Sequence, residues 1–209
     1  MTVDLETHRR RSDSRHWAGT LCLWAGLLGA ASGIYLAAVR PAVSPERFSY
    51  PLESAQFALI QIWFVIQHLG LLVGIVALGA NGATARSGSS RFGQVAAVVG
   101  MTMLTLTEFV AILAARAPAS SNSVTLLEVG YGISSTLIGL GLVMVGVAVL
   151  RSRTWHGWHR FVPLAIGVYV FVPMTPALAG PFVVARIAIS GWMLLFALLG
   201  WTLMKSEVA

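Results

Sequence analysis

Six apolar runs alternate with short polar segments along the chain. They cover residues 17–39, 55–78, 94–115, 126–150, 161–178 and 182–204. Each run is close to the roughly 20 residues with which an α-helix crosses a hydrocarbon core about 30 Å thick. A chain segment is stable in lipid only where its backbone hydrogen bonds are satisfied internally. The pattern therefore predicts an all-α fold, a polytopic integral membrane bundle of six transmembrane helices.

The first and fifth runs each raise an alternative. Residues 17–39 are too long for the apolar core of a cleaved signal peptide, so we expect an uncleaved helix. In the fifth run, Pro173 and Pro176 each remove a helical hydrogen bond, and Gly180 and Pro181 follow directly. The fifth and sixth runs would alternatively form a re-entrant hairpin, which gives fewer crossings.

The polar segments define three parts of the chain. Residues 1–16 are expected to form a basic cytoplasmic N-terminal tail, residues 17–204 the six-helix domain, and residues 205–209 a cytoplasmic C-terminal tail. Every connection between runs is far shorter than the roughly 40 residues below which a soluble domain rarely folds alone. The chain is therefore expected to consist of the helical bundle and its tails.

Composition supports a membrane class and argues against a nucleic-acid partner. Only 11% of the residues are charged, whereas a soluble domain carries about 25%, and the mean hydropathy is +0.77. The formal net charge is +6, but the basic excess lies beside apolar runs, where it meets anionic lipid headgroups. The single cysteine, Cys22, excludes a disulfide framework and a thiolate metal cluster.

The distribution of basic residues predicts the orientation. With a cytoplasmic N-terminus, the inner side receives Arg9, Arg10, Arg11, Arg15, Arg86, Arg91, Arg151, Arg153, Arg160 and Lys205, and the outer loops receive Arg40, Arg47 and Arg116. This is a positive-inside bias, so both termini are expected in the cytoplasm, beside the anionic headgroups of that face. The abundance of Arg, Ala, Gly and Val is typical of a GC-rich genome. We therefore expect a multi-pass protein of a bacterial cell membrane, with a homo-oligomer or a membrane-protein partner as open alternatives.

Local patterns predict where some helices begin and how they pack. Ser44-Pro45-Glu46 is typical of a helix start and predicts a short helix before the second span, and Thr125 with Glu128 matches a capping box for the fourth. Small residues recur at helical spacing in three spans: Gly29, Gly33, Gly70, Gly74, Gly132, Ser135, Gly139 and Gly146. Such faces allow close helix approach in lipid. The fourth span, which carries most of them, is expected at the centre of the bundle.

Four polar residues are predicted to share one layer in the outer half of the bilayer. At 1.5 Å per residue, Glu108 in the third span and Arg186 in the sixth lie at matching depths, and Gln61 and Tyr131 fall in the same layer. A charge at this depth costs about 2.5–3.5 kcal/mol on insertion scales and needs a partner or a purpose. We expect a polar cavity here that binds a ligand or an ion, beside an unwound, proline-broken fifth helix. The alternatives are a structural ion pair between Glu108 and Arg186, or an arginine that only reaches for the headgroups.

Two further residues extend this hypothesis inward. Thr105 lies one turn deeper than Glu108 on the same face, and His68 is the deepest ionisable residue, beside Gln67. Imidazole titrates near neutral pH, which suits a proton relay or a pH sensor. The simpler interpretation of His68 is a neutral side chain hydrogen-bonded to a neighbouring helix. A haem held by two histidines is not expected, because the apolar runs contain no second histidine.

Other chemistry finds little support. His156 and His159 are three residues apart, but no Cys, Asp or Glu near them completes a metal site, so contact with lipid headgroups is the expected role of this loop. The chain contains no nucleotide-binding loop and no nucleophile elbow, so we expect no cofactor and regard a lipid enzyme as a third alternative. The favoured hypothesis is a small permease-like or solute-binding protein. Its rival is a non-catalytic accessory or sensory subunit whose polar residues are structural.

Overall fold

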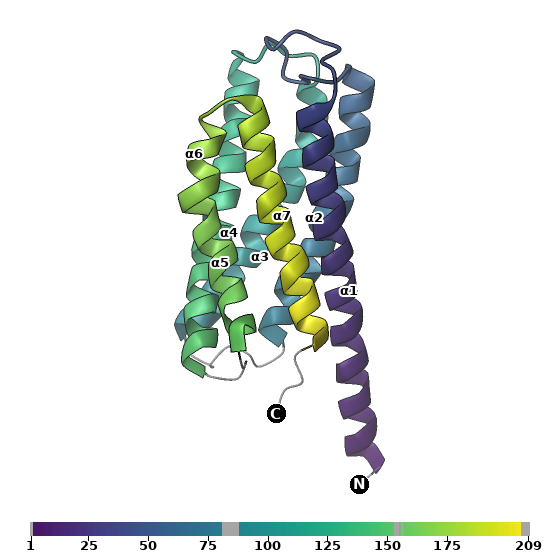
Figure 1. Cartoon of the computed structure of the whole chain (residues 1–209), viewed down its shortest axis with the longest axis vertical. Helices are drawn as coiled ribbons and strands as arrows, with labels where there is room; N and C mark the ends of the chain where they lie inside the picture. Colours follow the sequence, from purple (N-terminus) through teal and green to yellow (C-terminus); the bar gives the residue numbers. More distant parts are fainter. Residues whose placement is uncertain (1, 81–87, 153–154, 156, 206–209) are drawn as a thin grey trace.

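The protein folds into a bundle of long helices with no strand among the residues described (Figure 1). This computed structural model describes residues 2–80, 88–152, 155 and 157–205, with side chains from residue 13 onward. Six helices are long and apolar enough to cross a membrane: Asp13–Ala38, Ser54–Ala80, Gly88–Ala114, Asn122–Ser152, Gly157–Leu178 and Phe182–Lys205. The prediction of an all-α fold with six such helices is confirmed. Arg86, Arg153 and His156 lie outside the described residues.

The helices that make up these spans are regular apart from the ends and the fifth span. They are α1 (Thr2–Ala38), α2 (Ser54–Ala80), α3 (Gly88–Ala111), α4 (Asn122–Ser152), α5 (Val162–Tyr169), α6 (Thr175–Leu178) and α7 (Phe182–Lys205). Helix α1 continues from the tail into the first span, and α3 closes with a 3-10 turn, Ile112–Ala114. A 3-10 turn, Gly157–Phe161, precedes α5.

The beginning of α1 and the end of α7 lie at the same end of the bundle (Figure 1). We call this the terminal end, and we call the opposite end, where the connections 39–53 and 115–121 lie, the distal end. An even number of spans requires this arrangement. Many large apolar side chains on the helices point away from the bundle, including Leu59 (68% exposed), Leu106 (60%) and Leu113 (87%). An outer surface of this kind suits lipid rather than water.

The fifth span stays helical through its prolines, which corrects the expectation of unwound backbone. A π-helical turn, Val170–Met174, joins α5 to α6 and contains Pro173. The Thr175 backbone N–H bonds to the Val170 carbonyl oxygen across this turn, and the Thr175 hydroxyl donates to the same oxygen at 2.6 Å. Inserting one residue into the turn lets the chain accommodate the missing proline donor while neighbouring carbonyls keep partners.

Two helix starts also differ from the sequence patterns. Residues 44–47 form a turn rather than a short helix, closed by Arg47 N–H donating to the Ser44 carbonyl oxygen at 3.0 Å. Helix α4 begins one turn before the predicted capping box, where the Ser121 hydroxyl accepts from the Val124 N–H at 3.4 Å. The two distal loops also meet, because Arg47 pairs with Pro118 in an isolated β-bridge.

Glycines set the closest helix contacts. Helices α1 and α7 form one close pair and α3 and α4 the other. An added Cβ at Gly26 would lie 2.6 Å from the Met193 carbonyl oxygen, and one at Gly100 would lie 2.8 Å from the Ser134 carbonyl oxygen. Backbones this close leave no room for a side chain, so glycine is required there. Only part of the predicted small-residue stripe on α4 lies at a close helix contact, because a Cβ added at Gly132 would have no neighbour within 4 Å.

Candidate functional site

Glu108 joins three helices near the distal end. Its side chain on α3 is 8% exposed and its Oε2 atom accepts two hydrogen bonds. Gln61 Nε2 on α2 donates one at 2.7 Å, and the Tyr131 hydroxyl on α4 donates the other at 2.7 Å. Gln61 Nε2 also lies 3.3 Å from the Tyr131 oxygen. The structure thus brings three of the four predicted layer residues into direct contact.

The register between α2 and α3 explains why Gln61 reaches Glu108. Gln61, His68 and Ile75 recur at intervals of seven on the buried face of α2. Near the other end of this seam, Gln94 Nε2 on α3 donates to the Ile75 carbonyl oxygen at 2.6 Å. The residues that form the two cross-helix bonds are separated by the same number of positions on α2 and on α3, which run antiparallel. The two bonds are therefore compatible with a single register between these helices.

The second carboxylate oxygen of Glu108 is unused by the described residues. Oε1 accepts no hydrogen bond from the described residues. Several fully buried polar atoms in the described residues also lack a partner, but Oε1 is not one of them, so it retains some accessible surface. Both donors to Oε2 are neutral groups. The buried carboxylate therefore has no cation in direct contact and one oxygen able to accept a further donor.

Arg186 on α7 carries the opposite charge in the same region. Its charge acts through space on Glu108 and Tyr131, yet the two residues form no direct ion pair in the described part of the chain. The guanidinium instead lies over the Phe182 ring, 4.9 Å from its centroid. This cation–π contact stabilises the position of the charge without using its N–H donors as an ion pair would.

The Phe182 ring that contacts Arg186 also packs against Tyr50. The Tyr50 and Phe182 rings meet edge to face at 5.1 Å between centroids. Tyr50 belongs to the connection between α1 and α2, which is tied to the other distal loop where Phe48 N–H donates to the Ala117 carbonyl oxygen at 3.1 Å. Sequence reasoning missed both aromatic residues. The four-residue spacing of Phe182 and Arg186 on one helix is the signal that would have found Phe182.

The structure does not bring Thr105 into this cluster. Its side chain is buried, but its hydroxyl donates to the Met101 carbonyl oxygen of its own helix at 2.8 Å. The predicted continuation of the polar chain from Glu108 through Thr105 is therefore not formed by direct hydrogen bonds.

His68 also stands apart from the cluster. It is 3% exposed, and its Nδ1 atom has no hydrogen-bond partner among the described residues. The helix–helix hydrogen bond expected of a structural histidine is not formed. Its neighbour Gln67 does cross to another helix, since Gln67 Nε2 donates to the Ser32 hydroxyl at 3.1 Å, as Trp63 Nε1 does at 3.0 Å. This small polar group between α1 and α2 was not predicted.

At the terminal end, His159 packs against aromatic side chains. His159 packs beside two indoles that stack on each other at 5.6 Å, with its ring 4.2 Å from the Trp158 ring and 5.5 Å from the Trp201 ring between centroids. No cluster of three or more potential metal ligands exists within the described ranges. Stacked indoles and a histidine at a helix end are typical of a membrane interface.

Comparisons of the chain with protein-family models, with curated proteins and with solved structures find no match. Functional inference therefore rests on the chemistry of the site.

Proposed function

We propose that the protein is a small permease-like membrane protein that binds a small polar solute or ion in the layer of Glu108 and Arg186. In this proposal it spans a bacterial cell membrane with both termini in the cytoplasm, so the site lies in the outer half of the bilayer. The observation that carries the proposal is the pair of opposite charges with unused hydrogen-bonding capacity. Glu108 Oε1 and the Arg186 guanidinium are coupled through space but not joined.

The energetics of buried charge support a ligand. Intramembrane charges usually pair with each other or mark a substrate or ion pathway. A direct ion pair would have satisfied both groups, and the structure leaves both open. A solute that donates to Glu108 and accepts from Arg186 would satisfy each group where no described side chain does.

This pair of charges selects a ligand class. A positive group fits the carboxylate, and a negative group fits the planar guanidinium, which binds carboxylates with two parallel hydrogen bonds. Small zwitterions such as amino acids carry both. The carboxylate would also accept a proton, which would couple solute binding to pH.

Uptake into proteoliposomes tests the proposal. The probes are radiolabelled amino acids, with sodium and potassium ions as alternative substrates. We expect at least one probe to accumulate with the wild-type protein and to be lost in Glu108→Gln and Arg186→Gln. Glu128→Gln is the matched control, because Glu128 is an exposed acid on α4, one helical turn from Tyr131. Uptake that persists unchanged in Glu108→Gln, or no uptake of any probe by the wild type, would overturn the proposal.

A second candidate is an accessory or sensory subunit, and one observation favours it. Glu108 ties α2 and α4 to α3 through Gln61 and Tyr131, as a structural clasp would. Purification from the native membrane separates the candidates. A partner protein retained at a fixed ratio supports the accessory role, whereas a monodisperse single species supports the permease-like role.

A further inference from the structure

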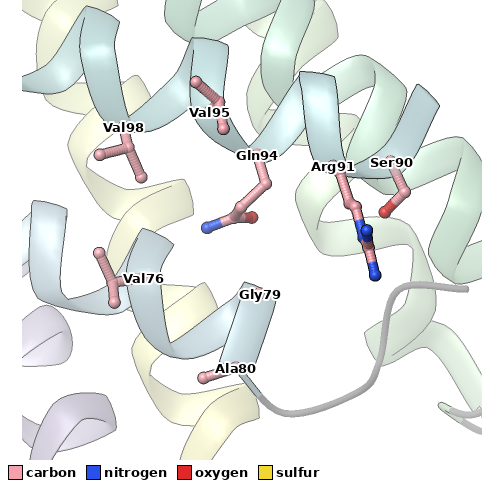
Figure 2. A pocket seen from close by; sticks show the side chains of 8 residues that line it. All are labelled: Val76, Gly79, Ala80, Ser90, Arg91, Gln94, Val95 and Val98. Carbon is pink, nitrogen blue, oxygen red and sulfur yellow. The ribbon is translucent and has the colours of Figure 1, made fainter. Parts of the chain in front are cut away.

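A groove between α2 and α3 at the terminal end combines apolar and charged surfaces (Figure 2). Its volume is about 430 Å³, within the range of roughly 300–1,000 Å³ that small-molecule sites occupy. Its lining consists of Val76, Gly79 and Ala80 on α2 with Ser90, Arg91, Gln94, Val95 and Val98 on α3. The groove lies far along the α2–α3 seam from Glu108 and is independent of the proposed solute site.

The lining is ordered along the helix axes. Val76 and Val98 lie at one end of the groove, Gln94 lies between the helices, and Arg91 lies with Ser90 at the other end, near the start of α3 (Figure 2). Arg91 is exposed, and it forms no ion pair with another described residue. A groove that is apolar at its deep end and cationic at its mouth has the polarity of a phospholipid, whose chain lies deeper than its phosphate.

Gln94 adds a polar feature to the floor. Its Nε2 donates to the Ile75 carbonyl oxygen at 2.6 Å, whereas its Oε1 is buried and has no partner among the described residues. The amide packs against Gly79, where an added Cβ would lie 2.6 Å from the Gln94 Cδ atom. The absent side chain at Gly79 leaves room for this amide on the floor of the groove.

We infer that this groove is a binding site for an anionic phospholipid, such as a phosphatidylglycerol. Its phosphate lies against the Arg91 guanidinium, and an acyl chain covers Val76, Val95 and Val98. Charge complementarity identifies the occupant: further basic residues, Arg151, Arg160 and Lys205, lie at the same end of the bundle. Anionic lipid is the partner that such an end attracts.

Native mass spectrometry of the full chain in detergent tests the inference. The probes are phosphatidylglycerol and phosphatidylcholine with identical acyl chains. We expect a saturable phosphatidylglycerol adduct on the wild type that weakens about tenfold in Arg91→Gln and is restored in Arg91→Lys. Arg116→Gln removes the same charge from an exposed site at the distal end and should leave the adduct within about twofold of wild type.

A second variant tests the groove itself. Val76→Trp fills the apolar end while Arg91 is kept, and because Val76 is 48% exposed the fold should tolerate the larger side chain. Loss of the adduct in this variant supports a seated chain. The inference is overturned if both lipids bind equally, if Arg91→Gln and Val76→Trp bind phosphatidylglycerol like wild type, or if soluble glycerol phosphate displaces the lipid completely. The last outcome would identify a site for soluble anions.

Discussion

Glu108 and Arg186 carry opposite charges in one layer of the bundle, and they act on each other through space without forming an ion pair. Neutral donors from two other helices hold one carboxylate oxygen, and an aromatic ring holds the guanidinium. This separation is the basis of the proposal that the layer is a ligand site rather than an ion-pair clasp. In a clasp the two charges would have neutralised each other directly.

The hydroxyl of Tyr131 should stabilise the fold through Glu108. Tyr131→Phe removes a 2.7 Å hydrogen bond to a buried carboxylate, so we expect a loss of about 1–3 kcal/mol in the free energy of unfolding. Chemical unfolding in detergent measures it. Tyr35→Phe is the control, because Tyr35 is 54% exposed, and equal stability of the two variants would contradict the role of Tyr131.

The contact between α1 and α7 should tolerate no side chain at Gly26. An added Cβ there would lie 2.6 Å from the Met193 carbonyl oxygen and 2.8 Å from the Ala197 Cα atom. Gly26→Ala should therefore lower the melting temperature, because the two backbones have to separate. Gly132→Ala is the matched change, since an added Cβ there has no neighbour within 4 Å. Gly132→Ala should be neutral or should raise the free energy of unfolding by up to about 1 kcal/mol. If Gly132→Ala destabilised the protein more than Gly26→Ala does, α1 and α7 would not be in close contact at Gly26.

His68 and Gln67 should differ in what their loss does to stability. His68 leaves a buried nitrogen without a partner, so His68→Phe should be neutral or stabilising, since it removes a desolvated polar group. Gln67→Leu removes the 3.1 Å hydrogen bond to Ser32 and should destabilise by about 0.5–1.5 kcal/mol. A loss of stability in His68→Phe as large as in Gln67→Leu would mean that His68 supports the fold.

The aromatic contact of Arg186 should contribute to its position. Phe182→Leu keeps an apolar side chain but removes the ring that lies under the guanidinium, and cation–π contacts contribute about 0.5–2 kcal/mol. We expect probe uptake in proteoliposomes to weaken in Phe182→Leu more than in Phe171→Leu. Phe171 lies on the fifth span and packs against Gly139. Equal uptake by both variants would show that the ring has no part in placing the charge.

The sequence was sufficient for the six helices because each apolar run satisfies its own backbone hydrogen bonds and needs no neighbour to do so. Depth was also predictable from the helical rise, which placed Glu108, Gln61 and Tyr131 in one layer. Their mutual contact was not, because the neighbours of a helix depend on packing across the whole bundle. Their role as a binding site stays a prediction.

Other features depended on long-range contacts that no local pattern records. Tyr50 packs on Phe182 in a connection that is also hydrogen-bonded to the other distal loop. The fifth helix continues through Pro173 because a π-helical turn and the Thr175 hydroxyl serve the carbonyl oxygen of Val170. Proline spacing alone indicated a break and could not show how the chain would accommodate it.

A double-mutant cycle on the free energy of unfolding in detergent tests the central claim most directly, with Glu108→Gln, Arg186→Gln and the two combined. If the charges are reserved for a ligand, Arg186→Gln should be neutral or stabilising, and the coupling energy between the two sites should stay well below that of a direct buried ion pair. If they form a clasp, each single change should cost about 3–5 kcal/mol and the double variant should recover much of the loss. That second result would contradict the ligand site and favour the accessory role.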